Sequence, residues 1–187
     1  VLHICKYLKK TRAKGMILTP TTTLDLNLFV DSDYAGLFAV EDKMDSISVK
    51  SRTGFVITLA GCPIAWKSTL QQEICLSSTE AETVALSQAL RLFVPLREQL
   101  MFVSSQFELS RGTKIKVTAK SQIFEDNAAT LQLARTKRLS PRTRHITAKH
   151  WWSLQQIQGD DKTGGIVIKK IDGKQNPADI FTKNTDV

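Results

Sequence analysis

The chain has 187 residues, 42% of them hydrophobic, which is enough for one domain with a sizeable core. Lys and Arg number 26 against 18 Asp and Glu, so the net charge is +8, which favours a polyanionic partner such as nucleic acid. Three scattered cysteines without a CxxC pair indicate neither a disulfide framework nor a zinc site. No stretch approaches the roughly 20 apolar residues of a membrane span, so we expect no membrane partner.

The first residues are predicted to be separate from the main domain. Residues 1–10 carry apolar and basic side chains at helical spacing, and a polar connector follows them. A helical start without Met suggests a segment taken from a longer polypeptide. We therefore expect residues 1–22 to be an appendage and residues 23–187 to form the main domain.

Three strands are predicted at the beginning of the main domain. From residue 24 to residue 30 every second residue is apolar, and this alternation is followed directly by Asp31. Residues 53–59 and 64–66 are typical of two further strands, with a turn at 61–63. The short connections predict three consecutive antiparallel strands.

A long helix is predicted next, from a capping-box spacing at 77–80 to about residue 104, and Pro95 should kink or split it. In helical projection Glu82 lies on the apolar stripe of this helix, whereas Glu80 projects to a mostly polar face and is expected to meet solvent. An ionised Glu on an apolar face is costly unless a cation or hydrogen-bond donors receive it. Glu82 is therefore a candidate functional residue.

The remaining elements alternate between strand and helix. Residues 114–126 predict a fourth strand ending at Asp126, and residues 127–134 predict the helix after it. A helix around 151–154, with Trp151 and Trp152 expected in the core, precedes a fifth strand at 164–168 and a short final helix that contains Asp179. The order βββαβααβα predicts an α/β fold in which helices flank a mixed sheet.

Four acids recur at comparable places: Asp31 and Asp126 at strand ends, and Glu82 and Asp179 in helices. Each of the aspartates has an ordinary structural explanation, because Asp commonly forms turns and compensates the helix dipole. The pattern of the four together is what suggests a site.

Seven motifs, in order along the chain, resemble the ribonuclease H of copia-type retrotransposon reverse transcriptases. They are Asp31-Ser32-Asp33-Tyr34-Ala35-Gly36, Ser51-Arg52-Thr53-Gly54-Phe55, Trp66-Lys67-Ser68, Ser77-Ser78-Thr79-Glu80-Ala81-Glu82, Glu125-Asp126-Asn127-Ala128-Ala129, Arg142-Thr143-Arg144-His145-Ile146 and Ala178-Asp179-Ile180-Phe181-Thr182-Lys183.

The resemblance implies a ribonuclease H-like fold, with a five-stranded mixed sheet of three antiparallel strands and two parallel additions. It also implies a catalytic and metal-binding set of Asp31, Glu82, Asp126 and Asp179 that holds two Mg²⁺ ions, for which Mn²⁺ can substitute. The choice of Asp31 over Asp33 rests on the motif alone. The implied reaction is cleavage of the RNA strand of RNA/DNA hybrids during reverse transcription.

The same resemblance implies that residues 1–22 are the end of the polymerase or connection segment, so that the polymerase domain of the same polyprotein is a partner. It places the protein in the cytoplasm, within virus-like particles, or in the nucleus. Two alternatives stay open: a non-catalytic nucleic-acid-binding domain, or a DNA nuclease of a related fold.

Residues 127–159 contain no acid but several basic residues, an arrangement suited to a phosphate backbone or, alternatively, to a solvated face. The candidate nucleic-acid-binding residues are Lys67, Arg138, Arg142, Arg144, His145 and Lys149. Cellular ribonucleases H carry a His before their last helix, whereas no His follows His150 here, so that role does not transfer to His145.

Overall fold

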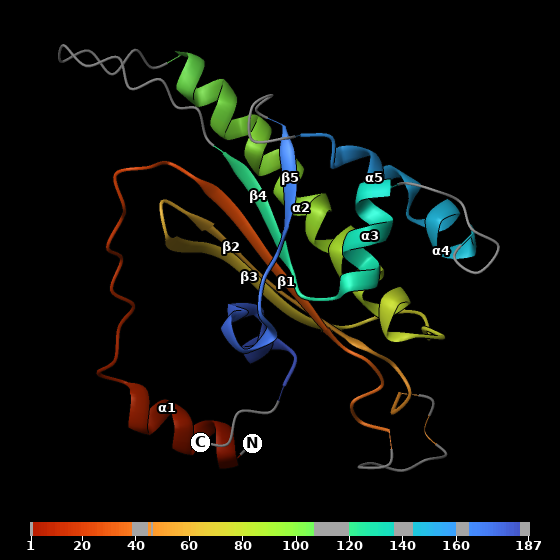
Figure 1. Ribbon diagram of the computed structural model, residues 1–187. Coiled ribbons are helices and arrows are strands. Elements are labelled where there is room, and N and C mark those ends of the chain that lie inside the picture. Colours follow the sequence, from red (N-terminus) through yellow and green to blue (C-terminus); the bar gives the residue numbers. More distant parts are fainter. Residues whose placement is uncertain are drawn as a thin grey trace.

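A five-stranded mixed sheet forms the centre of the fold (Figure 1). The computed structural model describes residues 2–38, 45, 47–106, 120–136, 144–159 and 165–183. The strands are β1 (Leu26–Asp33), β2 (Arg52–Leu59), β3 (Cys62–Leu70), β4 (Ser121–Glu125) and β5 (Ile166–Lys170), and they lie in the order β3-β2-β1-β4-β5. Strands β1, β2 and β3 are antiparallel, whereas β4 is parallel to β1 and β5 is parallel to β4. The predicted fold class is confirmed.

Helices cover one face of this sheet. They are α2 (Ser78–Gln106), α3 (Ala128–Thr136), α4 (Arg144–Lys149) and α5 (Trp151–Gln156), while α1 (Leu2–Thr11) lies apart from them (Figure 1). Two short 3₁₀ helices, η1 (Gly173–Gln175) and η2 (Pro177–Phe181), follow β5. Helix η2 packs on β1 and β2 from the opposite face. Of the helices described, none is long and apolar enough to cross a bilayer.

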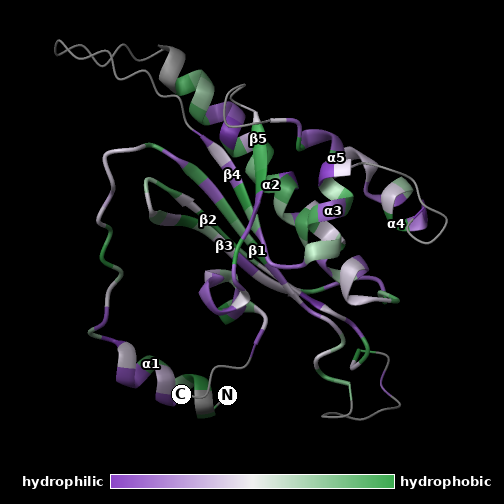
Figure 2. Cartoon of the chain, in the orientation of Figure 1, coloured by the Kyte–Doolittle hydropathy of each residue, from purple (hydrophilic) through white to green (hydrophobic). Residues whose placement is uncertain are grey.

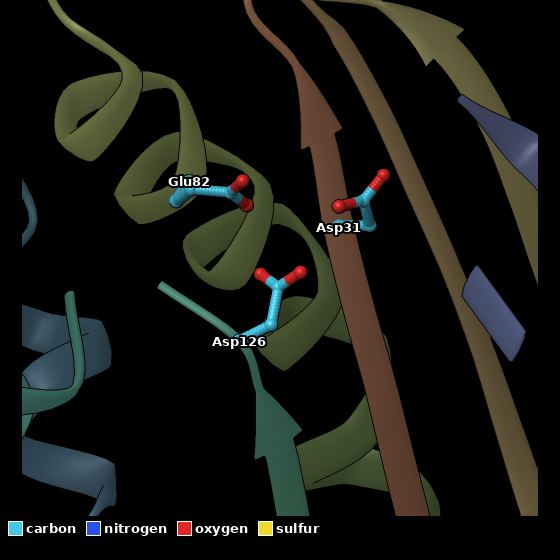
Figure 3. Close-up of side chains that lie close together, drawn as sticks. All are labelled: Asp31, Glu82 and Asp126. Carbon is cyan, nitrogen blue, oxygen red and sulfur yellow. The ribbon is translucent and has the colours of Figure 1, made fainter. Parts of the chain in front are cut away.

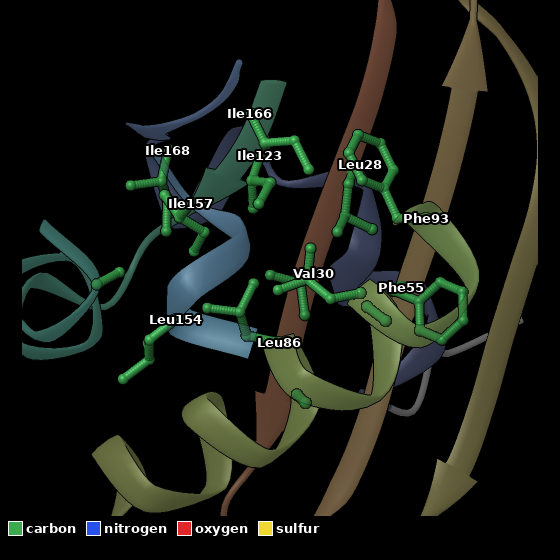
Figure 4. Close-up of a cluster of buried hydrophobic side chains, with 14 of the residues drawn as sticks. Leu28, Val30, Phe55, Leu86, Phe93, Ile123, Leu154, Ile157, Ile166 and Ile168 are labelled. Atoms are coloured by element: carbon green, nitrogen blue, oxygen red, sulfur yellow. The ribbon is translucent and has the colours of Figure 1, made fainter. Parts of the chain in front are cut away.

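The core lies between β1 and α2, as the two periodicities predicted. Leu26, Leu28 and Val30 of β1 point toward the helices and are at most 1% exposed. On α2 the stripe that begins at Glu82 is fully buried and packs against these strand residues (Figure 4). Figure 2 shows the same concentration of hydrophobic residues along the central strands and α2. Each large apolar side chain buried here contributes about 1.5–3 kcal/mol.

The beginning of α2 has the predicted cap, but Glu80 differs from its prediction. The Ser77 hydroxyl accepts a hydrogen bond from the Glu80 N–H at 3.2 Å, and the Glu80 carboxylate accepts one from the Leu76 N–H at 2.8 Å. Glu80 is therefore only 6% exposed, and the expectation that it meets solvent is wrong. The helix also continues through Pro95 without splitting.

Two further expectations need correction. The turn between β2 and β3 is made by Ala60 and Gly61, both with positive φ, so residues 62 and 63 already belong to β3. Trp151 and Trp152 are 39% and 46% exposed, because α5 turns the two following residues toward the core instead. The predicted short final helix is present as the 3₁₀ helix η2, whereas residues 114–119 of the predicted fourth strand lie outside the described residues.

Gly54 of β2 makes room for η2. It is the cross-strand partner of Asp31, and an added Cβ would lie 2.6 Å from Cγ2 of Thr182 and 2.9 Å from Cβ of Phe181. Both distances are too short, so any larger residue would push η2 away from the sheet.

We therefore expect Gly54→Ala to lower the free energy of unfolding by about 1–3 kcal/mol, the usual cost of overpacking. Chemical denaturation would measure this loss. Gly15→Ala is the matched control, because no atom lies within 4 Å of a Cβ added there, and it should leave stability nearly unchanged. Equal stability of the two variants would contradict the proposed packing role of Gly54.

Candidate active site

Three carboxylates from three different elements meet at one end of the sheet. Asp31 comes from β1, Glu82 from α2, and Asp126 directly follows β4 (Figure 3). One oxygen of each lies within 4.8 Å of the others. Asp31 and Glu82 are buried and Asp126 is half-buried. The structure therefore brings together three of the four predicted acids in a group that could hold a metal ion.

The parallel pairing of β1 with β4 explains why two of these acids are neighbours. Phe29 is level with Phe124 in the register, and their rings stack at 4.8 Å. Asp31 and Asp126 each follow two residues later, so continuing this register places them opposite each other, about 4.8 Å apart in the pairing direction. Glu82 reaches them because it lies on the buried stripe of α2, which crosses β1.

Asp179, the fourth predicted acid, lies beside this group but outside it. It belongs to η2, its side chain is 27% exposed, and one of its oxygens accepts a hydrogen bond from the Lys183 ammonium at 2.6 Å. Its charge is close enough to raise the pKa of both Asp31 and Asp126. Lys183 therefore neutralises part of the negative charge of the site.

Two hydrogen bonds fasten η2 to the strand that carries Asp31. The Thr182 hydroxyl donates to the carboxylate of Asp31. The Asn176 amide donates to the Val30 carbonyl at 2.8 Å, while its oxygen caps η2 by accepting from the Ala178 N–H at 3.1 Å. The position of Asp179 is thus coupled to the end of β1.

A fifth acid, Glu125, is buried beneath the group. It is 0% exposed and one of its oxygens accepts from the Asn127 N–H at 3.0 Å, whereas the other has no partner among the described residues. It is the largest electrostatic influence on Glu82. The sequence analysis did not select Glu125, although alternation in β4 places it on the inner face with Ile123.

The electrostatics follow from burial and crowding. Burial is the main cause that raises the pKa of Glu82 far above its ordinary value, and repulsion from Glu125, Asp31 and Asp126 adds to it. The pKa values of Asp31 and Asp126 are also raised, chiefly by burial, with Asp179 the largest repulsive neighbour of each. Such a group is strained when ionised without a cation.

The donor set suits a hard divalent cation. Carboxylate oxygens are the ligands that Mg²⁺ prefers, and oxygens of Glu82 and Asp179 are buried without a hydrogen-bond partner among the described residues. A cation bound here would supply the missing partner and cancel the repulsion. The identity of the metal and the number of ions stay predictions.

Of the candidate nucleic-acid-binding residues that the structure describes, three lie on α4 and one on β3. Lys67 is exposed on β3, and Arg144 and His145 are exposed at the beginning of α4. Lys149 forms an ion pair with Glu73, which reduces its availability for phosphate. Arg138 and Arg142 lie outside the described residues.

Comparisons with known proteins agree with this geometry. The chain is 28% identical, over 98% of its length, to the retrovirus-related Pol polyprotein of the tobacco transposon TNT 1-94, and 27% identical, over 97%, to that of the Arabidopsis transposon RE1. It spans only 12% and 11% of those two proteins. The N-terminal RNase H domain of a Mycobacterium tuberculosis protein shares its fold, with a TM-score of 0.52 and 13% identity over 86% of this chain and 91% of the other. No protein-family model matches.

The chain is similar over nearly its whole length to retrovirus-related Pol polyproteins, and its fold is that of ribonuclease H. The resemblance noted from its motifs is thereby confirmed. The boundary at residue 22 and the roles of individual site residues stay predictions.

We expect Mg²⁺ to raise the melting temperature of this protein, because it relieves the repulsion among the carboxylates. At a concentration a hundred times the Kd the gain is about 2.7 kcal/mol, or roughly 5–10 °C. Asp126→Asn should stabilise the metal-free protein and lose most of the Mg²⁺ effect. Calorimetry with EDTA and with Mg²⁺ tests both, and a destabilised variant together with an unresponsive wild type would contradict them.

The raised pKa of Glu82 also predicts how stability depends on pH. Because the folded protein holds this proton more tightly than the unfolded chain, the contribution to stability is complete below the ordinary pKa of 4.5 and is lost as the pH rises toward about 10. We expect the melting temperature in EDTA to fall between about pH 5 and about pH 9, and Glu82→Gln to flatten the decline. Glu98→Gln, exposed on the same helix, is the control. A wild-type curve that is flat or rising over this range would refute the prediction.

Proposed function

We propose that this domain is a divalent-metal-dependent endonuclease that cleaves the RNA strand of RNA/DNA hybrids during retrotransposon reverse transcription. The observation that carries the proposal is the meeting of Asp31, Glu82 and Asp126, from three elements of a ribonuclease H fold, within 4.8 Å. Similarity to retrovirus-related Pol polyproteins over nearly the whole chain supports the biological setting.

The residues of the chain have distinct parts in this mechanism. Asp31, Glu82 and Asp126 would hold the metal, with Asp179 beside them. Divalent ions held by these carboxylates would supply Lewis-acid activation of a water and charge stabilisation at the leaving 3′ oxygen. Thr182 orients the Asp31 carboxylate through its hydroxyl, and Lys183 holds Asp179 through its ammonium. No side-chain nucleophile is needed.

The wider setting belongs to the same proposal. Because the chain spans about an eighth of its Pol relatives or less, we propose the polymerase domain of the same polyprotein as its partner. The predicted location in virus-like particles in the cytoplasm, or in the nucleus, has no support from the fold. Selection of a hybrid over duplex DNA would require contacts with 2′-hydroxyls in the minor groove.

The test is to incubate the purified protein with labelled RNA/DNA hybrid, duplex DNA and duplex RNA, in Mg²⁺ or in EDTA. We expect cleavage of the RNA strand of the hybrid alone, only with Mg²⁺. Glu82→Gln should reduce the rate at least 100-fold, since changes in groups that merely orient ligands already cost about 10–100-fold. The control Glu98→Gln should retain full activity.

Other outcomes would assign the domain differently. A mobility shift of the hybrid without cleavage in Mg²⁺ would support a non-catalytic binding domain. Cleavage of duplex DNA would support a nuclease of related fold. Cleavage that survives Glu82→Gln would come from a contaminant and would contradict the proposal.

A further inference from the structure

A polar cleft lies beside the acid cluster formed by Asp31, Glu82 and Asp126. It has a volume of about 270 Å³, and its polar wall is formed by Asp33, Lys50, Arg52, Ser68, Thr182 and Lys183. Thr182 and Lys183 also contact Asp31 and Asp179, so the cleft and the acid cluster share one wall.

The charges of the cleft favour an anion. Lys183 is paired with Asp179, and the other two cations of the lining, Lys50 and Arg52, face one acid, Asp33. Lys50 and Arg52 are half-buried, and neither forms an ion pair with any residue in the described part of the chain. The guanidinium of Arg52 donates one long hydrogen bond, 3.4 Å, to the Ser68 hydroxyl, although it carries five N–H donors. A planar fork of this kind suits a phosphate group.

The cleft is also held rigidly with respect to the acids. Arg52 is the cross-strand partner of Asp33 in the β1–β2 ladder. The Ser68 hydroxyl donates to the Phe181 carbonyl, which ties β3 to the end of η2 just before Thr182. Arg52 therefore stands on a strand, and its distance from Asp31 is set by the sheet.

The distance from Asp31 to Arg52 along the sheet is comparable with a short step along a nucleic-acid strand. Asp33 is two residues beyond Asp31 in β1, or about 6.6 Å along the strand. One strand of a duplex rises about 3.4 Å per nucleotide along the helix axis. Arg52, opposite Asp33, is thus offset from Asp31 along β1 by about the length of one or two nucleotide steps.

We propose that this cleft binds a backbone phosphate of the cleaved strand, one or two nucleotides from the scissile bond, through Lys50 and Arg52. This inference rests on the proposed function. It places a substrate contact outside the acid-free basic segment at 127–159. Its role is to fix the register of the strand, since phosphate contacts position a nucleic acid without reading its sequence.

The experiment measures binding of an RNA/DNA hybrid to the Glu82→Gln protein, in which cleavage is silenced, over a series of salt concentrations. Adding Arg52→Gln or Lys50→Gln should weaken binding and reduce the slope of log K against log salt by about 0.7–0.9 for each lost contact. Lys120→Gln is the matched control, because Lys120 is exposed at the other end of β4 from Asp126, and its slope should be unchanged.

A second arm places one uncharged methylphosphonate at successive positions of the RNA strand. We expect the largest loss of affinity one or two nucleotides from the cleaved bond, and no such loss at that position when Arg52→Gln is present. Inorganic phosphate should compete only weakly; strong competition without dependence on methylphosphonate position would make this a site for free phosphate and overturn the proposal.

The outcomes separate this inference from the proposed function. Hybrid binding with the same slope in Arg52→Gln, Lys50→Gln and Lys120→Gln would overturn the phosphate site alone. If Arg52→Gln fails to fold, Lys50→Gln, which lies outside the strands, carries the same test. Absence of any hybrid binding by the Glu82→Gln protein would contradict the proposed function itself.

Discussion

Parallel pairing of β1 with β4 places Asp31 beside Asp126, which directly follows β4. Two ionised carboxylates at this spacing repel each other, and burial together with this crowding also raises the pKa of Glu82 and Glu125. The hydrophobic packing of β1 against α2 must offset that repulsion for the chain to fold without a cation. The site therefore depends on the stability of the sheet and helix that carry it.

On the opposite face of the sheet, η2 serves to position Asp179 more than to bury apolar surface. Helix η2 is only five residues long, so it has little stability of its own, and its place is set by contacts with the sheet. Gly54 allows the close approach, Asn176 attaches the helix to Val30, and Thr182 attaches it to Asp31. Asp179, the acid of this short helix, is thereby held beside the acids on the sheet and on α2.

Periodicity alone predicted the features in which apolar residues recur at regular spacing along a buried face. The alternation in β1 and the helical stripe of α2 correctly placed the core residues and Glu82, because each pattern reports a face packed on a neighbour. It was wrong for Glu80, whose burial comes from one hydrogen bond to a backbone N–H, and for Trp151 and Trp152, whose exposure depends on how α5 is seated. Asp179 could be selected only through the family motif, because its neighbourhood is created by η2 folding back on β1.

The distribution of charge matters more than the net charge of +8. Lys149 lies in the segment richest in basic residues, yet it is already paired with Glu73. Lys50 and Arg52 come from a less basic part of the chain, but they are half-buried beside the acids without an ion pair among the described residues. A partly desolvated cation in a fixed position interacts more strongly with phosphate than an exposed one, because water screens it less. The cations best suited to bind the nucleic-acid strand are thus those that the fold places next to the carboxylates.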